Sequence, residues 1–149
     1  MPSEKPTLIS LDPDDYHARY VGHLSDGRQF FLTSPFVPAI QGNPGREFIA
    51  LYLFNETGIL LEARIVDMGT RANLNKEDAT RQFSILLGEV GKFDSRRIEI
   101  QPFEIQRFGV AFGFIPRAPQ KDDGDWWVVV QPGNFMAFHE PWDSGEYDT

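Results

Sequence analysis

The segment 46–54 limits the fold more than any other part of this sequence of 149 residues. From Phe48 onward it is apolar or aromatic at every position, Phe-Ile-Ala-Leu-Tyr-Leu-Phe. The run is short and lies between the turn-rich segments 41–45 and 55–58, which favours a strand over a helix. A strand that is apolar on both faces has to be covered on both faces. The sequence therefore predicts a central strand that is covered on both sides.

One amphipathic helix is predicted over residues 76–90. Asn75 is a good N-cap, because its side chain can accept a hydrogen bond from the first turn, and Gly91 is a natural C-terminal stop. Positions i, i+4, i+7, i+8 and i+11 form a single apolar stripe. This stripe consists of Ala79, Phe83, Leu86, Leu87 and Val90. One such stripe is about what a helix needs to lie across one face of a sheet.

Alternation and turn chemistry predict the other strands. Asp26-Gly27 and the segment 55–58 indicate hairpin turns. Pro102 has no N–H group to donate, so it predicts a bend or a break inside the long β region 97–115. With the central strand, the strands expected are about seven: 16–24, 29–34, 46–54, 59–67, 97–115, 126–130 and 135–138.

Successive hairpins with a single helix predict an α+β fold. We expect one curved, mostly antiparallel sheet of about seven strands, with the helix at about 76–90 packed on one face. A partly closed β-barrel is the alternative. The length fits one domain over residues 1–149. Within it we expect an irregular N-terminal arm at residues 1–15 and an acidic surface segment at residues 140–149.

Composition excludes several kinds of site. The sequence contains no cysteine, which excludes disulfides, thiol catalysis and thiolate metal ligands. No apolar run approaches the ~20 residues that a membrane helix needs. The first residues also lack the basic-then-apolar order of a secretory signal. We therefore expect a cytoplasmic protein that does not associate with membranes.

The net charge of −8 is concentrated toward the two ends of the sequence. Residues 120–149 carry seven acidic residues and one basic residue, and residues 1–15 carry four and one. Residues 16–119 are nearly balanced, with 11 acidic and 12 basic residues. Nucleic-acid binding needs clustered lysine and arginine, so no nucleic-acid partner is expected.

No pattern in the sequence indicates catalysis, a metal site or another cofactor. His17 and His23 would lie roughly 20 Å apart along a strand, which is too far for one metal ion. His139 precedes Glu140, but their spacing matches no specific metal motif. The Gly-x-Ser-x-Gly elbow of serine hydrolases is absent from the sequence. These observations favour a protein that is not an enzyme.

The C-terminal segment is the first candidate binding surface. Residues 139–149 combine four acidic residues and two amphipathic aromatic residues with no lysine or arginine. Such a mixture suits a surface that binds a basic protein. We expect a non-enzymatic interaction protein, similar in composition alone to small acidic immunity or inhibitor proteins. The partner-binding residues would be Glu140, Trp142, Asp143, Glu146, Tyr147 and Asp148.

An apolar cavity is the alternative candidate site. A curved, phenylalanine-rich sheet with a helix across it can leave a pocket for a small apolar ligand or for the substrate of a small enzyme. The segment 126–130 is apolar on both faces, which also makes a homo-oligomer a hypothesis. The side chains expected to line the cavity are Phe31, Phe48, Tyr52, Phe112 and Trp127.

Overall fold

A computed structural model describes residues 5–14, 18–120, 124–133, 136–139, 142 and 145–147. This part of the chain contains thirteen strands, the helix α1 (Lys76–Val90) and one short 3-10 helix, η1 (Arg71–Asn73). Every ladder between the strands is antiparallel. The expectation of an α+β fold, with mostly antiparallel strands and one helix, is confirmed.

The larger sheet has six strands. Five of them follow the order β4-β5-β3-β2-β7, and the sixth, β6, pairs with β5 off this path. From Phe48 to Phe54 every residue of β5 is buried, so the predicted central strand is confirmed. The strands are β2 (Tyr20–Leu24), β3 (Gln29–Thr33), β4 (Phe36–Val37), β5 (Arg46–Phe54), β6 (Leu60–Asp67) and β7 (Phe93–Ser95).

A second sheet has five strands in the order β13-β12-β11-β10-β9, and a third consists of β1 paired with β8. The three sheets are separate and none is closed, so the single sheet of about seven strands and the barrel alternative are both wrong. The strands are β1 (Ile9–Leu11), β8 (Ile98–Ile100), β9 (Phe103–Arg107), β10 (Val110–Arg117), β11 (Trp127–Gln131), β12 (Met136–Phe138) and β13 (Gly145–Tyr147).

Pro102 explains why one predicted β region becomes several strands. It lies between β8 and β9, directly before Phe103, and it cannot donate to a ladder. The chain therefore leaves β1 there and begins β9 in a different sheet. Phe108 and Gly109 then form a two-residue turn between β9 and β10, both with positive φ (54° and 73°). The break expected at Pro102 is thus present, but the region 97–115 contributes to three strands in two sheets, and not to two shorter strands as we expected.

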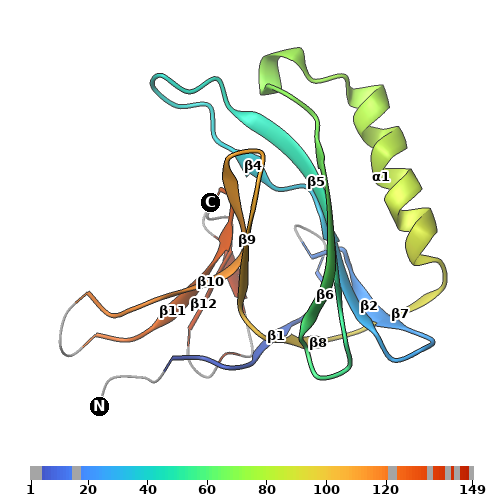
Figure 1. Ribbon diagram of the computed structural model, residues 1–149, viewed down its shortest axis with the longest axis vertical. Helices are drawn as coiled ribbons and strands as arrows, with labels where there is room; N and C mark the ends of the chain where they lie inside the picture. The colour runs from blue at the N-terminus through green and yellow to red at the C-terminus, as the bar shows by residue number, and fades with distance from the viewer. Residues whose placement is uncertain are drawn as a thin grey trace.

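The elements form three layers, with the larger sheet in the middle (Figure 1). One face of this sheet packs against α1, and the other packs against the five-stranded sheet and the β1–β8 pair. Alternation along β3 and β5 divides the side chains between the two cores. Those on the helix side are Phe30, Leu32, Ile49, Leu51 and Leu53, and those on the other side are Phe31, Ala50, Tyr52 and Phe54.

We had expected an irregular N-terminal arm, but part of it, β1, is a strand. Ile9 and Leu11 of β1 are buried in the core between the sheets, and β1 pairs with β8. The N–H group of Ser10 also donates to the carbonyl oxygen of Trp142, at 2.8 Å. The two apolar residues of β1 are separated by one position, which is the spacing of a strand with one buried face.

Gln29 joins three separate segments through its buried side chain. Its Nε2 atom donates to the carbonyl oxygens of Asn55 (3.0 Å) and Glu99 (2.9 Å), and its Oε1 atom accepts from the N–H group of Glu99 (2.7 Å). Only 2% of Gln29 is exposed. The amide therefore connects β3 to the turn after β5 and to β8, and it satisfies backbone groups that no ladder reaches.

Replacing Gln29 with leucine should lower the free energy of unfolding by at least about 2 kcal/mol. The N–H and carbonyl groups of Glu99 would lose their bonds to Gln29, and the carbonyl oxygen of Asn55 would keep only its bond from the N–H group of Gly58. Each group left unsatisfied away from water costs about 1–3 kcal/mol. Chemical denaturation measures this loss. Gln106→Leu is the matched control, because Gln106 lies exposed on β9 and donates only to Glu104. Equal losses in the two variants would show that the buried amide has no special structural role.

Candidate functional site

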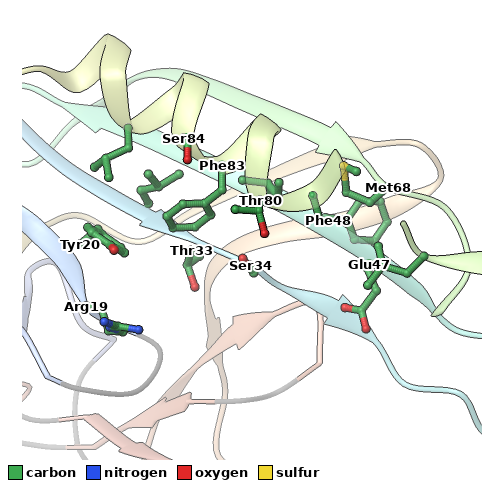
Figure 2. Close-up of a pocket in the computed structure, with 15 residues that line it drawn as sticks. Arg19, Tyr20, Thr33, Ser34, Glu47, Phe48, Met68, Thr80, Phe83 and Ser84 are labelled. Carbon is green, nitrogen blue, oxygen red and sulfur yellow. The ribbon is translucent and has the colours of Figure 1, made fainter. Parts of the chain in front are cut away.

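A groove of about 600 Å³ lies between α1 and the larger sheet. Residues of β3 and β5 form its floor, α1 forms one wall, and Tyr20 of β2 lies at one end (Figure 2). The segment between β6 and α1 contributes to the opposite end. The apolar part of the lining consists of Leu32, Phe48, Ile49, Met68, Leu74, Ala79, Phe83 and Leu87.

The groove exists because α1 is fully packed along only part of its apolar stripe. Leu86 and Val90, toward the C-terminal end of the helix, are buried against the sheet. Ala79 and Phe83, nearer its N-terminal end, are only half-buried and line the groove. An ion pair between Glu89 and Arg64 of β6 also ties the C-terminal end to the sheet. The sequence predicted the bounds of α1 and its stripe correctly, but not that the stripe would be covered unevenly.

Both helix caps have the predicted chemistry, which fixes where the groove wall begins and ends. The side chain of Asn75 accepts a hydrogen bond from the N–H group of Asp78 at 3.0 Å. Gly91 follows the last turn with φ of 72°, a conformation that glycine adopts without steric cost. The helical register set by these caps places Thr80, Phe83, Ser84 and Leu87 along the groove.

An aromatic contact connects the helix wall with the sheet. The rings of Tyr20 and Phe83 meet edge to face, with centroids 5.2 Å apart and an interplanar angle of 60°. In Figure 2, Phe83 projects from the helix toward the sheet, on the side where Tyr20 lies. Because both rings are half-buried, part of their apolar surface remains in contact with solvent in the groove.

Hydroxyl groups add a polar margin to the apolar lining. Ser34 from the sheet, and Thr80 and Ser84 from α1, are exposed and line the groove (Figure 2). Thr33 lines it as well but is buried. Each hydroxyl can donate one hydrogen bond and accept others, so the margin can orient a bound polar group. Sequence reasoning missed these residues, although Thr80 and Ser84 flank Phe83 with the spacing of one helix face.

Two charged residues of opposite sign lie at the two ends of the groove. Arg19 lies beside Tyr20, and its guanidinium group is 5.8 Å from the centroid of that ring. Glu47 lies at the other end, near Met68, and its carboxylate accepts from Nε of Arg71 at 2.9 Å (Figure 2). The charge of Glu47 is therefore matched by a neighbour on the protein.

A polar cluster nearby has a structural role. Arg46 of β5 forms an ion pair with Asp67 and donates to the carbonyl oxygen of Phe108 at 2.8 Å. The ring of Phe108 stacks on Phe48, with centroids 6.2 Å apart. Burial of the Asp67 carboxyl favours a higher pKa, but the bond from Gly69 and the charge of Arg46 outweigh it, so the pKa is lowered. These contacts hold the β9–β10 turn against the larger sheet.

Of the five aromatic residues that we expected to line a cavity, one, Phe48, is among the residues that line this groove. The ring of Phe48 also meets Phe112 edge to face at 5.0 Å. Phe31, Tyr52 and Phe112 are fully buried. Trp127 lies on β11, in the five-stranded sheet. Strand parity explains much of the difference, because Phe31 and Tyr52 point away from α1.

The expected partner-binding residues lie partly outside the described structure. Glu140, Asp143 and Asp148 are outside it, and Glu146 and Tyr147 belong to β13, at the edge of the five-stranded sheet. Trp142 is half-buried and packs against the core between the sheets. The participation of these residues in binding a basic protein stays a prediction.

The described residues show neither a metal site nor a membrane-spanning helix. They include no group of three or more histidine, aspartate or glutamate side chains placed to hold a metal ion. They also contain no helix long and apolar enough to cross a membrane. No family model matches the sequence, and no curated protein or solved structure matches it either.

Tyr52 is a buried phenol in the core between the sheets. Its ring contacts those of Phe103, at 5.0 Å, and Phe31, at 6.3 Å between centroids. Burial raises the pKa of its hydroxyl group, which therefore stays protonated near neutral pH. In the described part of the chain, no side chain or backbone group forms a hydrogen bond with this hydroxyl.

Tyr52→Phe should therefore leave the free energy of unfolding unchanged or raise it by about 1 kcal/mol. The substitution keeps the ring and removes a buried hydroxyl that has no protein partner, and such a group costs about 1–3 kcal/mol. Thermal or chemical denaturation of the two proteins measures the difference. A clear loss of stability would mean that the hydroxyl has a hydrogen-bond partner in the folded protein.

Proposed function

We propose that the protein binds a small, largely apolar molecule in the groove between α1 and the larger sheet. The observation that carries this proposal is a groove of about 600 Å³ with an apolar floor and a few polar groups at its margin. Small-molecule sites in proteins have volumes of roughly 300–1,000 Å³ and this mixture of lining groups.

The incomplete burial of the helix stripe supports a bound ligand. The apolar stripe of α1 has a buried part, which consists of Leu86 and Val90. The rest of the stripe is only half-buried and remains partly in contact with water: Ala79, Phe83 and Leu87. An apolar ligand would remove that surface from water, which stabilises the complex by about 25 cal/mol for each Å² of apolar area. The ligand would thus complete the layer that α1 leaves open.

The groove supports binding better than catalysis. Its charged lining residues are Arg19 and Glu47, and the carboxylate of Glu47 is already in an ion pair with Arg71. A general base needs access to a proton of the substrate, and a nucleophile needs an adjacent base. Neither arrangement is present among the described lining residues. We therefore favour a carrier or sensor of a small molecule over a small enzyme.

Binding to a basic protein through residues 140–149 is the second candidate function. The charge pattern favours it, because residues 120–149 carry seven acidic residues and one basic residue. Such a surface attracts a basic partner and accelerates their encounter. A cysteine-free chain is compatible with a reducing compartment, and we include a cytoplasmic location in this proposal.

Thr80→Trp should block the groove and weaken ligand binding about tenfold or more, since the exposed Thr80 side chain lines it. The neutral fluorophore N-phenyl-1-naphthylamine serves as the probe, and its fluorescence increases in an apolar site. Titration of the probe into the full chain gives the dissociation constant.

Arg81→Trp is the matched control for this test. Arg81 is the next residue of α1, is exposed and does not line the groove. We expect it to bind the probe as the unmodified protein does. If the unmodified protein does not bind the probe, or if both tryptophan variants bind it equally well, the groove is not the ligand site.

Neutralising the C-terminal acids should weaken binding to a poly-lysine peptide about tenfold at low salt. The variant combines Glu140→Gln, Asp143→Asn and Asp148→Asn, which leaves β13 and Trp142 in place. The control combines Glu56→Gln, Glu77→Gln and Glu104→Gln, three exposed positions elsewhere. Fluorescence anisotropy of a labelled peptide measures both. Similar losses would indicate a response to net charge alone and would exclude the segment as a specific surface.

A further inference from the structure

The charge of the groove changes along its length. Glu47 lies at the end near Met68, and the N-terminal turn of α1, with Glu77 and Asp78, lies toward the same end (Figure 2). Two cations also belong to that end: Arg71, which is already paired with Glu47, and Lys76, which begins the same helical turn as Glu77 and Asp78. Arg19 lies at the opposite end, beside Tyr20 (Figure 2). A ligand that carries a charge would thus meet different surroundings at the two ends.

Arg19 is available to a ligand. Its side chain is exposed, and no carboxylate of the described residues forms an ion pair with it. Its guanidinium group lies over the ring of Tyr20, 5.8 Å from the ring centroid. This contact orients the group, and because the ring has no net charge, the positive charge of the guanidinium is not neutralised. A guanidinium group offers several N–H donors in a planar arrangement that matches a carboxylate.

The part of the chain that builds the groove does not oppose an anion as strongly as the net charge of −8 suggests. All the lining residues fall between Arg19 and Leu87. Residues 16–119 carry 11 acidic and 12 basic residues, and the excess of acid lies outside them. Fields from exposed charges further away than ~8–10 Å are largely screened at physiological salt. Asp14 is an acid from the N-terminal segment that lies nearby, and its carboxylate accepts from the N–H group of Ala18 at 3.1 Å. Among the residues that line the groove, however, the charged ones are Arg19 and Glu47, and Glu47 is paired with Arg71. A ligand therefore meets the guanidinium group of Arg19 as the charge of the lining at that end.

From this polarity we infer that the groove binds an alkyl carboxylate, with the carboxylate at Arg19 and the chain extending over the apolar floor toward Met68. The single guanidinium group matches a head group with a single negative charge. The inference rests on the proposed function, because it names the chemistry of the ligand for that same groove. The margin hydroxyls of Ser34 and Ser84 lie within the lining and can add hydrogen bonds to a polar head group.

Displacement of N-phenyl-1-naphthylamine from the full chain tests the inference. The competitors are decanoate and decan-1-ol, which share a chain length and differ in head-group charge. We expect decanoate to displace the probe at a concentration about tenfold lower than decan-1-ol does, and high salt to reduce this preference. Arg19→Gln should abolish the preference for decanoate over decan-1-ol. Arg28→Gln is the control, since Arg28 is exposed, lies outside the groove and pairs with Asp26.

The possible outcomes separate the two proposals. If decanoate and decan-1-ol displace the probe equally well, or if Arg19→Gln keeps the preference for decanoate, the carboxylate inference is wrong and the groove remains a site for neutral ligands. The carboxylate inference would also be wrong if Arg28→Gln reduced the preference for decanoate as much as Arg19→Gln does. Failure of the unmodified protein to bind the probe would remove the proposed function, and the inference with it.

Discussion

The fold depends on the need to cover both faces of β3 and β5. Each strand is buried over its whole length or nearly so, and each directs large apolar side chains to both sides. If either face were left uncovered, several phenylalanine and leucine side chains would be exposed to water at once. Burying such a side chain is worth about 1.5–3 kcal/mol. A single sheet with one covered face cannot satisfy this requirement, so the chain adds a helix on one side and a second sheet on the other.

The two covering layers differ in how completely they cover the middle sheet. The five-stranded sheet and the β1–β8 pair enclose a continuous core that includes Phe31, Tyr52, Phe114 and Phe138. On the other side, α1 is one helix of 15 residues, about 22 Å long, and it buries only Leu86 and Val90 fully. The groove is thus the part of the helix-side core that the chain does not fill with its own side chains. The proposed ligand would occupy the space that α1 leaves uncovered on the larger sheet.

Local signals in the sequence were sufficient for the elements near the groove. The bounds of α1 follow from Asn75 and Gly91, and the central strand follows from a short apolar run between turns. The turn Asp26-Gly27 also has the expected form, with φ of 92° at the glycine. These features are set by neighbours within a few residues, which is why one sequence can reveal them.

The division of the strands into three sheets, and the site itself, depend on contacts between distant residues. No local pattern shows that β8 pairs with β1 rather than with the strand that follows Pro102. The aromatic residues were assigned to one cavity because aromatic content alone does not reveal which face of a strand turns toward the helix. Arg19 and Ser34 were missed because each becomes part of the groove only when α1 crosses strands that lie far from it in sequence.

The bond between Ser10 and Trp142 has a consequence for synthesis on the ribosome. The residue numbers of the donor and the acceptor differ by 132 (142 − 10), so the two are translated far apart in time. Trp142 also packs on the core to which Ile9 and Leu11 contribute. The larger sheet and its helix can be assembled from residues translated early. The inter-sheet core, in contrast, stays open on one side until Trp142 has left the exit tunnel, and during that interval its phenylalanine side chains are accessible to chaperones.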